Sequence, residues 1–369
     1  MAVTKQDVRR LASEAGFDLV RVTTADPFAD WERAVKERIA KGLIPLSSVQ
    51  DEEPFRRPDE WADPARNLEG ARSVLVVGMR YLVTGVEHDP DERVLRGRIA
   101  RQGWRDAYGD LYARRDRLVD LLSQKGARCA KKPCLPNKAA MARSGMGSYG
   151  MNAIIQTREH GSWVLATTVA TDAVLEPDAQ VEPTCDGCRA CIDACPTGAI
   201  VRPYVIDVGR CLTHVLSTAA PIPRDLRPLA GDRINGCDAC QEACPMNRAV
   251  EPRADDLTNP RKEWTERPAL LPLLNVSGKE FKQAFHDLDD RSEPQFLQRN
   301  ALVALGNLKD PSAVAQVARV LRGPNALLRA HAAWALGSIG GTAAKRALKD
   351  AALIEDDATV LDEIDEAMQ

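Results

Sequence analysis

The sequence predicts an α+β protein in three parts, and three observations support this prediction. Two short apolar runs, Ser73–Met79 and Gly161–Ala170, have the profile of buried strands, and a polar helical stretch, Tyr108–Lys125, lies between them. Eight cysteines fall within residues 185–244, among Pro-rich loops that leave room for few regular elements. From about Pro268 the sequence is helical to its end.

The segment before the first predicted strand reads as mostly helical, from Thr4 to about Ser73. Two amphipathic stretches support this reading, one beginning near Val8 and one around Trp31. Pro, Asp and Glu crowd Gln50–Pro64, which we expect to be an irregular surface loop. The resulting domain boundaries are 1–176 for an α/β domain, 177–267 for the cysteine region and 268–369 for a helical region.

Length and composition set the broad class of the protein. The chain has 369 residues, a formal net charge of −3 and 44% hydrophobic residues, which indicates a folded protein of two or three domains. The polar segment Met1–Arg10 has no signal-peptide pattern, and no apolar run is long enough to span a bilayer. We therefore expect a soluble cytoplasmic protein without membrane association.

The helical region contains a weak internal repeat. Arg299–Leu308 resembles Ala330–Ile339 at an offset of 31 residues, with Ala-Leu-Gly at equivalent places. Two similar amphipathic helices could arise by chance, but the coincidence favours a short pair of HEAT-type repeats. Because such a pair cannot bury its own core, we expect it to dock on the preceding domains.

The spacing of the cysteines predicts two iron–sulfur clusters. The run that begins at Cys185 reads C-x2-C-x2-C-x3-C-P, the spacing of bacterial two-cluster ferredoxins, whose fourth cysteine binds the other cluster. A single cysteine and a second C-x2-C-x3-C-P run supply the remaining ligands. The sets are Cys185, Cys188, Cys191 and Cys244 for the first [4Fe–4S] cluster, and Cys195, Cys211, Cys237 and Cys240 for the second.

Structural zinc and disulfides are the alternative uses of these cysteines. Zinc also binds C-x2-C pairs, but it has no need for the C-x3-C-P continuation that occurs twice. Disulfides are typical of short secreted chains, whereas this chain has 369 residues and shows no signal-peptide pattern. Two clusters indicate one-electron transfer and by themselves do not identify a substrate.

Four stretches together resemble one family. They are Asp63–Arg66 with Gly70–Leu75, the Gly-rich Ala142–Asn152, Gly161 with Ser162, and Gly236–Asn247 around the second cysteine run. Combined with the two-cluster module and the terminal repeats, they resemble the epoxyqueuosine reductases, the cobalamin-dependent enzymes that complete queuosine in tRNA. The resemblance covers nearly the whole chain and implies that the α/β domain binds a corrinoid.

The resemblance implies a chemistry and a set of contacts. In this family cobalamin binds with its lower base displaced, electrons pass through the outer and then the inner cluster to cobalt, and the epoxide oxygen leaves as water. Gly145, Gly147 and Gly150 would let the backbone approach the macrocycle, although they could also serve turns only. The residues implied to contact the cofactor are Arg143, Gly145, Gly147, Asn152, Ser162, Val208 and Asp238.

The chain departs from the family pattern at the site of proton delivery. The family places an aspartate shortly before the Gly-rich stretch, whereas Ala130 or Lys131 stands there in this chain. Gln102 replaces a family tyrosine, and Tyr108-Gly109 replaces a Tyr-His pair. Since a general acid contributes to rate, we predict that epoxyqueuosine reduction is slow or absent and that the true substrate needs no such acid. The candidate catalytic residues in this segment are Lys131 and Cys134.

Cys129 and Cys134 are surplus to the two clusters, and three uses are open for them. Both could be buried reduced thiols. Cys134 could face the cobalt or the substrate, with Lys131 and Lys132 lowering its pKa. The two could instead be a solvent-exposed redox-active pair.

The distribution of charge leaves tRNA as a candidate partner. Residues 93–117 hold eight arginines and three aspartates, a net charge of +5, which could contact phosphates or form an ordinary solvated face. The stretch 290–369 holds nine basic and eleven acidic residues, so the repeats are not a basic cradle.

The leading hypothesis is a cobalamin-dependent iron–sulfur reductase of the epoxyqueuosine reductase type. Two alternatives are a corrinoid reductase that acts on a different, non-tRNA substrate, and an electron-transfer or corrinoid-handling protein without its own substrate. In each case we expect a monomer that receives electrons from an external one-electron donor such as ferredoxin or flavodoxin.

Overall fold

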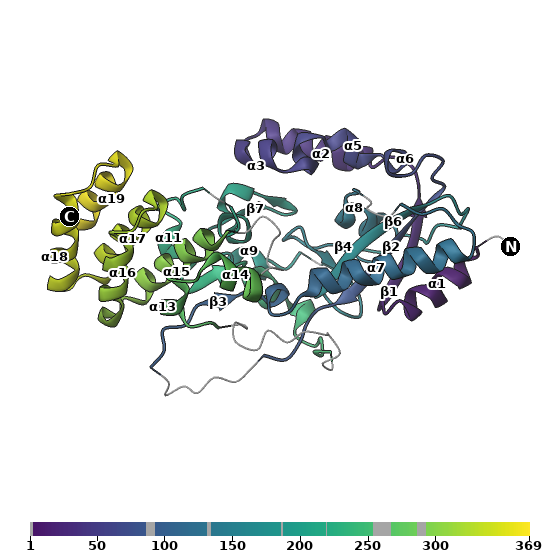
Figure 1. The fold of residues 1–369 in the computed structure, drawn as a ribbon. Coiled ribbons are helices and arrows are strands. Elements are labelled where there is room, and N and C mark those ends of the chain that lie inside the picture. Colours follow the sequence, from purple (N-terminus) through teal and green to yellow (C-terminus); the bar gives the residue numbers. More distant parts are fainter. Residues whose placement is uncertain are drawn as a thin grey trace. The chain divides into compact units, whose positions relative to one another are not determined.

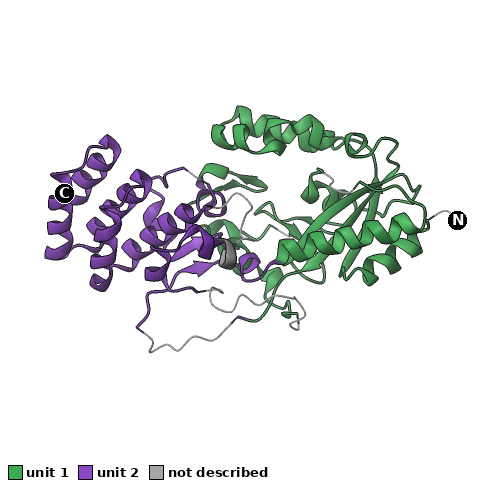
Figure 2. Ribbon diagram, viewed as in Figure 1, with its two compact units in different colours: residues 1–84, 107–209, 239–258 green, residues 85–106, 210–238, 259–369 purple. Residues whose placement is uncertain are grey.

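The computed structural model describes residues 3–85, 93–130, 134–185, 187–218, 220–253, 267–285 and 293–369. The chain forms two compact units that interleave along the sequence (Figure 2). Unit 1 comprises residues 1–84, 107–209 and 239–258, and unit 2 comprises residues 85–106, 210–238 and 259–369. The three domain boundaries drawn from the sequence stay a prediction, since the cysteine region contributes to both units.

Unit 1 is built on a three-stranded antiparallel sheet of order β1-β2-β6 (Figure 1). Its helices are α1 (Lys5–Glu14), α2 (Ala29–Ala40), α3 (Leu46–Asp51), α4 (Glu53–Arg56), α5 (Pro58–Ala62), α6 (Pro64–Asn67), α7 (Ala107–Gln124), α8 (Asn137–Arg143), α9 (Ala190–Asp193), α12 (Ala239–Glu242) and the 3-10 turn η3 (Pro245–Asn247). Its strands are β1 (Leu19–Thr24), β2 (Ser73–Arg80), β4 (Ser148–Tyr149), β5 (Ile155–Gln156), β6 (Val164–Thr171), β7 (Ile200–Arg202) and β8 (Val205–Ile206).

The central strand β2 is covered on both faces. Successive side chains of a strand point to opposite faces, so Val74 and Val76 share one face. These two valines pack with Ala140 and Met141 of α8 in one apolar cluster. The intervening Leu75 is fully buried as well, and α7 contacts both β2 and β6. Burial on both faces explains why this strand is a continuous apolar run in the sequence.

Three of the predicted elements are confirmed in unit 1. The run Ser73–Met79 corresponds to β2, the run Gly161–Ala170 overlaps all of β6 but its last residue, and the stretch Tyr108–Lys125 corresponds to α7 within one residue at each end. The helical interpretation of Thr4–Ser73 missed one element, because β1 lies within this segment and pairs antiparallel with β2.

The prediction of an irregular loop over Gln50–Pro64 was wrong. Four short helices, α3 to α6, occupy this stretch and the residues next to it. In α4, α5 and α6 a proline stands in the first two helical positions, where its missing N–H is no disadvantage. The prolines thus start helices here rather than interrupt them.

Unit 2 is mainly helical. Its helices are α10 (Leu212–Val215), α11 (Arg227–Ala230), α13 (Leu270–Leu273), α14 (Gly278–Phe285), α15 (Pro294–Leu308), α16 (Val314–Val320), α17 (Ala326–Ile339), α18 (Gly341–Ala352) and α19 (Ala358–Met368), with 3-10 turns η1 (Arg101–Gly103) and η4 (Pro311–Ala313). Strands β3 (Arg98–Ile99) and β9 (Arg233–Asn235) pair in parallel, and the 3-10 turn η2 (Val208–Arg210) lies at the boundary of the units.

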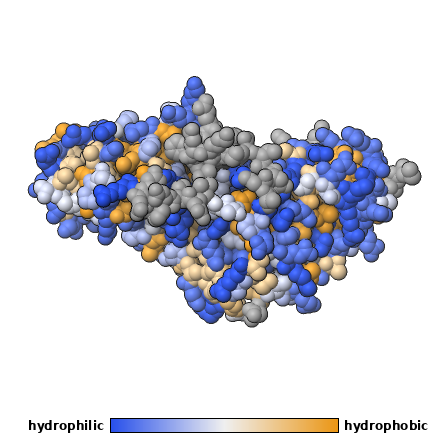
Figure 3. All heavy atoms as spheres, turned by 90° about the horizontal axis from the view of Figure 1, so that it is seen from below, coloured by the Kyte–Doolittle hydropathy of each residue, from blue (hydrophilic) through white to orange (hydrophobic). Residues whose placement is uncertain are grey.

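The two halves of the internal repeat are α15 and α17, which pack on each other (Figure 1). A second apolar cluster joins the repeats to the cysteine region, because Val303 of α15 is buried among Leu212, Leu216 and Leu226. The expected docking of the repeats on earlier sequence is therefore observed for residues 210–238. Among the described residues no helix combines the length and apolar composition needed to cross a bilayer. Hydrophobic side chains are scattered among hydrophilic ones on the face drawn in Figure 3.

Candidate redox and corrinoid site

Unit 1 brings together the four cysteines assigned to the first cluster. Partial burial raises the pKa of Cys191, and the neighbouring Cys185 and Cys244 raise it further. Burial likewise raises the pKa of Cys244, with contributions from Cys185 and Cys188. The four thiols therefore lie within electrostatic reach of one another, although Cys244 is far away in sequence.

The surroundings of the cysteine sulfurs in both predicted ligand sets are compatible with [4Fe–4S] ligands. Among the described residues no group of three or more His, Cys, Asp or Glu side chains could hold one metal ion. The ligands of a [4Fe–4S] cube bind four different irons and need not converge on one point. Two backbone N–H groups also point at sulfur, from Ala190 to Cys188 Sγ (3.4 Å) and from Ala199 to Cys195 Sγ (3.3 Å).

The four cysteines assigned to the second cluster are divided between the units. Cys195 and Cys240 belong to unit 1, whereas Cys211 and Cys237 belong to unit 2. Cys211 caps the start of α10, and Cys237 packs against the apolar cluster that contains Leu212. Their assignment as one ligand set stays a prediction.

A buried polar network ties the second cysteine run to the sheet of unit 1. Ser162 donates its N–H to Asn247 Oδ1 (2.8 Å) and its hydroxyl to Gln241 Oε1 (2.9 Å). Asn247 Nδ2 donates to Ser162 Oγ (2.9 Å), and the hydroxyl of Tyr81 donates to Gln241 Oε1 (3.2 Å). Ser162, predicted to contact cobalamin, is thus engaged within the protein. The roles of Gln241 and Asn247 were not predicted, although both lie in the recognised Gly236–Asn247 motif.

The glycines of the Gly-rich stretch are required by the protein's own packing. Gly145 has φ +69°, and a Cβ on it would lie 2.0 Å from the carbonyl oxygen of Ala179. A Cβ on Gly147 would lie 2.4 Å from the carbonyl oxygen of Gln156. Close backbone approach within the chain accounts for both glycines, so their presence does not by itself indicate a macrocycle.

Arg143 supports the start of this stretch. Its guanidinium donates to Thr23 Oγ1 (3.1 Å) and to the carbonyl oxygens of Thr24 (2.9 Å) and Asp26 (2.9 Å). It also stacks on Phe28, with 3.5 Å from Cζ to the ring centroid. Burial lowers the pKa of Arg143 to about 10. These contacts give Arg143 a role in joining α8 to the end of β1 and the segment that follows it.

Asn152 offers a donor that the protein leaves unused. Its side chain is buried, and Oδ1 accepts from the Ile154 N–H (3.2 Å), whereas Nδ2 has no hydrogen-bond partner. The buried Gln156 Oε1 also lacks a partner. A Cβ on Gly150 would touch both side chains, so the two amides lie next to this glycine. Buried polar atoms without a partner are rare and point to a missing ligand or water.

Val208 and Asp238, the other two residues predicted to contact the cofactor, lie in different units. The N–H of Val208 donates to the Leu43 carbonyl oxygen (2.8 Å) in unit 1. Asp238 lies in unit 2, where its Oδ2 accepts from the Arg101 N–H (2.6 Å). Their contacts with a cofactor stay predictions, as does the catalytic role of Lys131, which lies outside the described residues.

The environment of Cys134 differs from the expected one. Partial burial and the nearby Glu53 raise the pKa of its thiol, the opposite of the lowering expected from flanking lysines, which lie outside the described residues. Asn67 holds the backbone of Cys134 by bonds to its N–H and its carbonyl oxygen. Burial also raises the pKa of Cys129. Both thiols therefore stay protonated at neutral pH.

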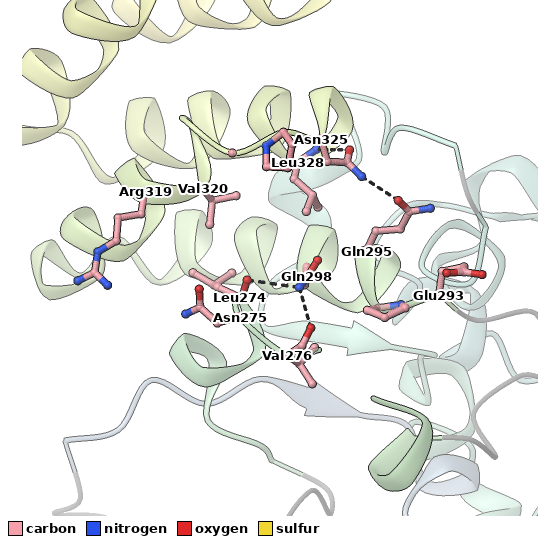
Figure 4. Close-up of a pocket in the computed structure, with 13 residues that line it drawn as sticks. Leu274, Asn275, Val276, Glu293, Gln295, Gln298, Arg319, Val320, Asn325 and Leu328 are labelled. Atoms are coloured by element: carbon pink, nitrogen blue, oxygen red, sulfur yellow. Dashed lines mark hydrogen bonds between the residues drawn. The ribbon is translucent and has the colours of Figure 1, made fainter. Parts of the chain in front are cut away.

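Unit 2 contains a groove of about 500 Å³ lined by the residues that follow α13, the start of α15, the end of α16 and the start of α17 (Figure 4). Three of its polar side chains are bonded within the protein, because Gln298 Nε2 donates to the Val276 carbonyl oxygen (3.2 Å) and Asn325 Nδ2 donates to Gln295 Oε1 (2.8 Å). None of the candidate redox or corrinoid residues lines this groove.

The fold and the cysteine site define a double-cluster iron–sulfur oxidoreductase with terminal HEAT repeats. Residues 184–247 match the family described as a 4Fe–4S double cluster binding domain, and residues 286–369 match HEAT repeats. The chain is 31% identical to the epoxyqueuosine reductase of Bacillus subtilis over 99% of this chain and 95% of that protein. It is 32% identical to the Bacillus cereus enzyme over 99% of this chain and 97% of that protein. This chain therefore belongs to the epoxyqueuosine reductase family.

Solved structures agree with this membership. A crystal structure of epoxyqueuosine reductase with an epoxyqueuosine-modified tRNA-Tyr stem loop has a TM-score of 0.90 and 30% identity, covering 99% of this chain and 97% of that one. A Bacillus subtilis structure with an aspartate catalytic loop swung out of the active site has a TM-score of 0.91 and 30% identity, covering 99% and 98%.

Proposed function

We propose that this chain is a cobalamin-dependent iron–sulfur reductase that converts epoxyqueuosine in tRNA to queuosine. The observation that carries the proposal is similarity over nearly the full length to epoxyqueuosine reductases, one of them solved with a modified tRNA stem loop. The reaction consumes two electrons and two protons, gives an alkene and releases the epoxide oxygen as water. Two one-electron clusters suit the delivery of these electrons from an external donor of the ferredoxin or flavodoxin type.

The Gly-rich stretch supports the cobalamin part of the proposal. The rim of a corrin ring carries carboxamide groups, which both donate and accept hydrogen bonds. Asn152 Nδ2 and Gln156 Oε1 are a buried donor and a buried acceptor without partners, so they fit such a rim. When bound base-off, cobalamin supplies a low-valent cobalt for the reduction. Arg143 and the two close-packed glycines hold this stretch in place.

Proton delivery is the part of the reaction for which this chain differs from the family pattern. No carboxylate stands at residues 130–134, and Cys134 is a weak acid because burial and Glu53 raise its pKa. Ala130 is buried, and its N–H donates to the Ala170 carbonyl oxygen (2.9 Å), so an acid there would be buried too. Lys131 is thus the better equivalent of the family aspartate. We expect slow turnover in the wild type.

The experiment is a comparison of Lys131→Asp with the wild type on an epoxyqueuosine-bearing tRNA stem loop. A general acid contributes on the order of 10²–10⁴-fold in rate, so Lys131→Asp should accelerate queuosine formation by about 10²-fold or more. Lys132→Asp changes the charge equally and is the matched control, which should stay near the wild-type rate. Wild-type turnover as fast as that of an aspartate-bearing relative would show that another residue supplies the proton.

The altered acid also favours a second candidate, a corrinoid reductase whose substrate needs no proton at this place. The same assay separates the two functions. Cobalamin binding with no queuosine formed by either the wild type or Lys131→Asp would support the second candidate. No change in the cobalamin spectrum on titration with the protein would instead favour an electron carrier.

The tRNA part of the proposal rests on the relatives rather than on the arginine-rich stretch. On α7, Arg114 Nη2 pairs with Asp110 (2.8 Å) and Arg115 Nη2 with Asp116 (2.8 Å). These pairs reduce the positive potential that the sequence alone indicated. If arginines of residues 93–117 bind tRNA phosphates, replacing them should weaken tRNA binding and make the binding constant depend less on salt concentration.

A further inference from the structure

Helix α15 carries two adjacent polar residues that are fully buried. Arg299 is 0% exposed and Asn300 is 1% exposed, in the middle of the first repeat helix. A buried polar or charged side chain is costly unless its hydrogen bonds are satisfied. The partners of these two residues therefore indicate why the helix retains them.

Arg299 is bonded to the end of α10 and to the stretch that follows it. Its guanidinium donates to the carbonyl oxygens of Val215 (3.2 Å), Thr218 (2.8 Å) and Ala220. Its Nε and Nη2 also donate to Asn300 Oδ1 (3.0 and 2.9 Å). Within the described part of the chain it forms no ion pair with a carboxylate, so its role is to bind carbonyl oxygens.

Asn300 joins two segments through one nitrogen atom. Its Nδ2 donates to the Leu216 carbonyl oxygen (2.8 Å) and to the Ile234 carbonyl oxygen (2.8 Å). Leu216 ends the turn of helix that Cys211 begins, and Ile234 lies in β9, three residues before Cys237. The amide thus sets the spacing between the two chain segments that carry these cysteines.

We infer that Arg299 and Asn300 are positioning residues for the second iron–sulfur cluster, through which the first repeat helix holds Cys211 and Cys237 in register. The inference rests on the proposed function only because it takes Cys211 and Cys237 as ligands of the second cluster. Groups behind the ligands tune a metal centre by orienting them, and hydrogen bonding and solvent access set cluster potentials. The repeats then have a role inside unit 2 that is separate from any contact with tRNA.

The same helix provides a matched control. Asn307 Nδ2 also donates to two carbonyl oxygens, those of Arg227 (2.8 Å) and Gly231 (2.9 Å). Arg227 and Gly231 both lie in one chain segment, α11 and the residue that ends it, and this segment contains no cysteine. Asn300→Asp and Asn307→Asp remove equivalent pairs of bonds, but only the first pair connects the cysteine segments.

The test is a potentiometric titration of the reconstituted, anaerobic full chain, followed by electron paramagnetic resonance. Cys211→Ser identifies the signal of the second cluster, which it should remove or change. Asn300→Asp should shift or abolish that signal and leave the first cluster unchanged, whereas Asn307→Asp should leave both unchanged. The same second-cluster signal and potential in Asn300→Asp as in the wild type would overturn the inference, as would an equal shift in Asn307→Asp.

A second variant, Arg299→Lys, tests the inference if Asn300→Asp does not fold. Arg299→Lys keeps the charge but loses the planar fork that reaches several carbonyl oxygens. It should fold and shift the potential of the second cluster, and an unchanged potential would contradict the inference. These readouts need no tRNA. Failure of the proposed function would therefore appear as absent turnover with both clusters intact, which is distinguishable from an unshifted cluster in the variants.

Discussion

His331 should make the helical repeats of unit 2 sensitive to acid. The imidazole is 0% exposed in α17. Its Nε2 accepts the Ile222 N–H (3.2 Å), so Nδ1 carries the proton and donates to the Leu327 carbonyl oxygen (2.7 Å). Burial, together with the nearby Arg227 and Arg299, lowers the pKa of His331 to about 3. The neutral ring is therefore part of the folded state.

The sign and size of the effect follow from proton linkage. Between the folded pKa near 3 and the unfolded pKa near 6.5, the unfolded state binds the additional proton, so stability falls as the pH falls through this window. At about pH 5, which is about 1.5 pH units below the unfolded pKa, the loss is about 2 kcal/mol relative to neutral pH.

The measurement is hydrogen exchange of peptides that span α17, corrected for the intrinsic pH dependence of exchange, with His331→Gln as the comparison. A glutamine oxygen can accept the Ile222 N–H and does not titrate. The wild type should lose about 2 kcal/mol more opening free energy than His331→Gln between neutral pH and about pH 5. Equal losses would refute the reasoning, because all other titrating groups are common to both proteins.

Three further predictions concern stability and metal content. Glu363→Ala should destabilise unit 2 by about 3–5 kcal/mol in chemical denaturation, because it leaves the buried Arg227 without its bidentate partner (2.7 and 2.9 Å). Arg224→Ala, which removes the more exposed partner of Glu363, should cost about 1 kcal/mol or less, and equal costs would contradict this account. Gly145→Ala should lower the melting temperature and cost about 2 kcal/mol or more, since φ is +69° and a Cβ would overlap the Ala179 carbonyl oxygen; an unchanged melting temperature would contradict it. Anaerobically purified protein should contain about eight irons and eight sulfides, and stoichiometric zinc without sulfide would exclude the clusters.

Helices and strands could be predicted from the sequence where neighbouring residues alone form a recognisable pattern. The strand β2 is apolar throughout because both of its faces are buried, and α7 has enough turns to show a helical pattern. The strand β1 was missed although Val20, Arg21, Val22 and Thr23 alternate as in a half-buried strand, because the strand is short and the helical pattern on either side of it was extended across it. The short helices α4 to α6 were missed because their prolines look like loop residues until their place in the first turn is known.

In the candidate site, too, features set by neighbouring residues could be predicted, and features set by residues far apart in sequence could not. The spacing of Cys185, Cys188 and Cys191 is local and predicts a cluster directly. Asn300 and Asn247 could not be assigned a role, because their partners are 66 to 85 residues away and a single asparagine has no pattern. The lowered pKa expected for Cys134 considered only its neighbours in sequence, whereas the fold raises the pKa through partial burial and through the approach of Glu53.

The most direct test of the central claim is mass spectrometry of the nucleosides from an epoxyqueuosine-bearing tRNA stem loop after incubation with reconstituted protein and reductant. We predict that queuosine forms only when cobalamin is present, slowly with the wild type and about 10²-fold or more faster with Lys131→Asp. No queuosine from either protein, with both clusters and cobalamin shown to be bound, would contradict the claim.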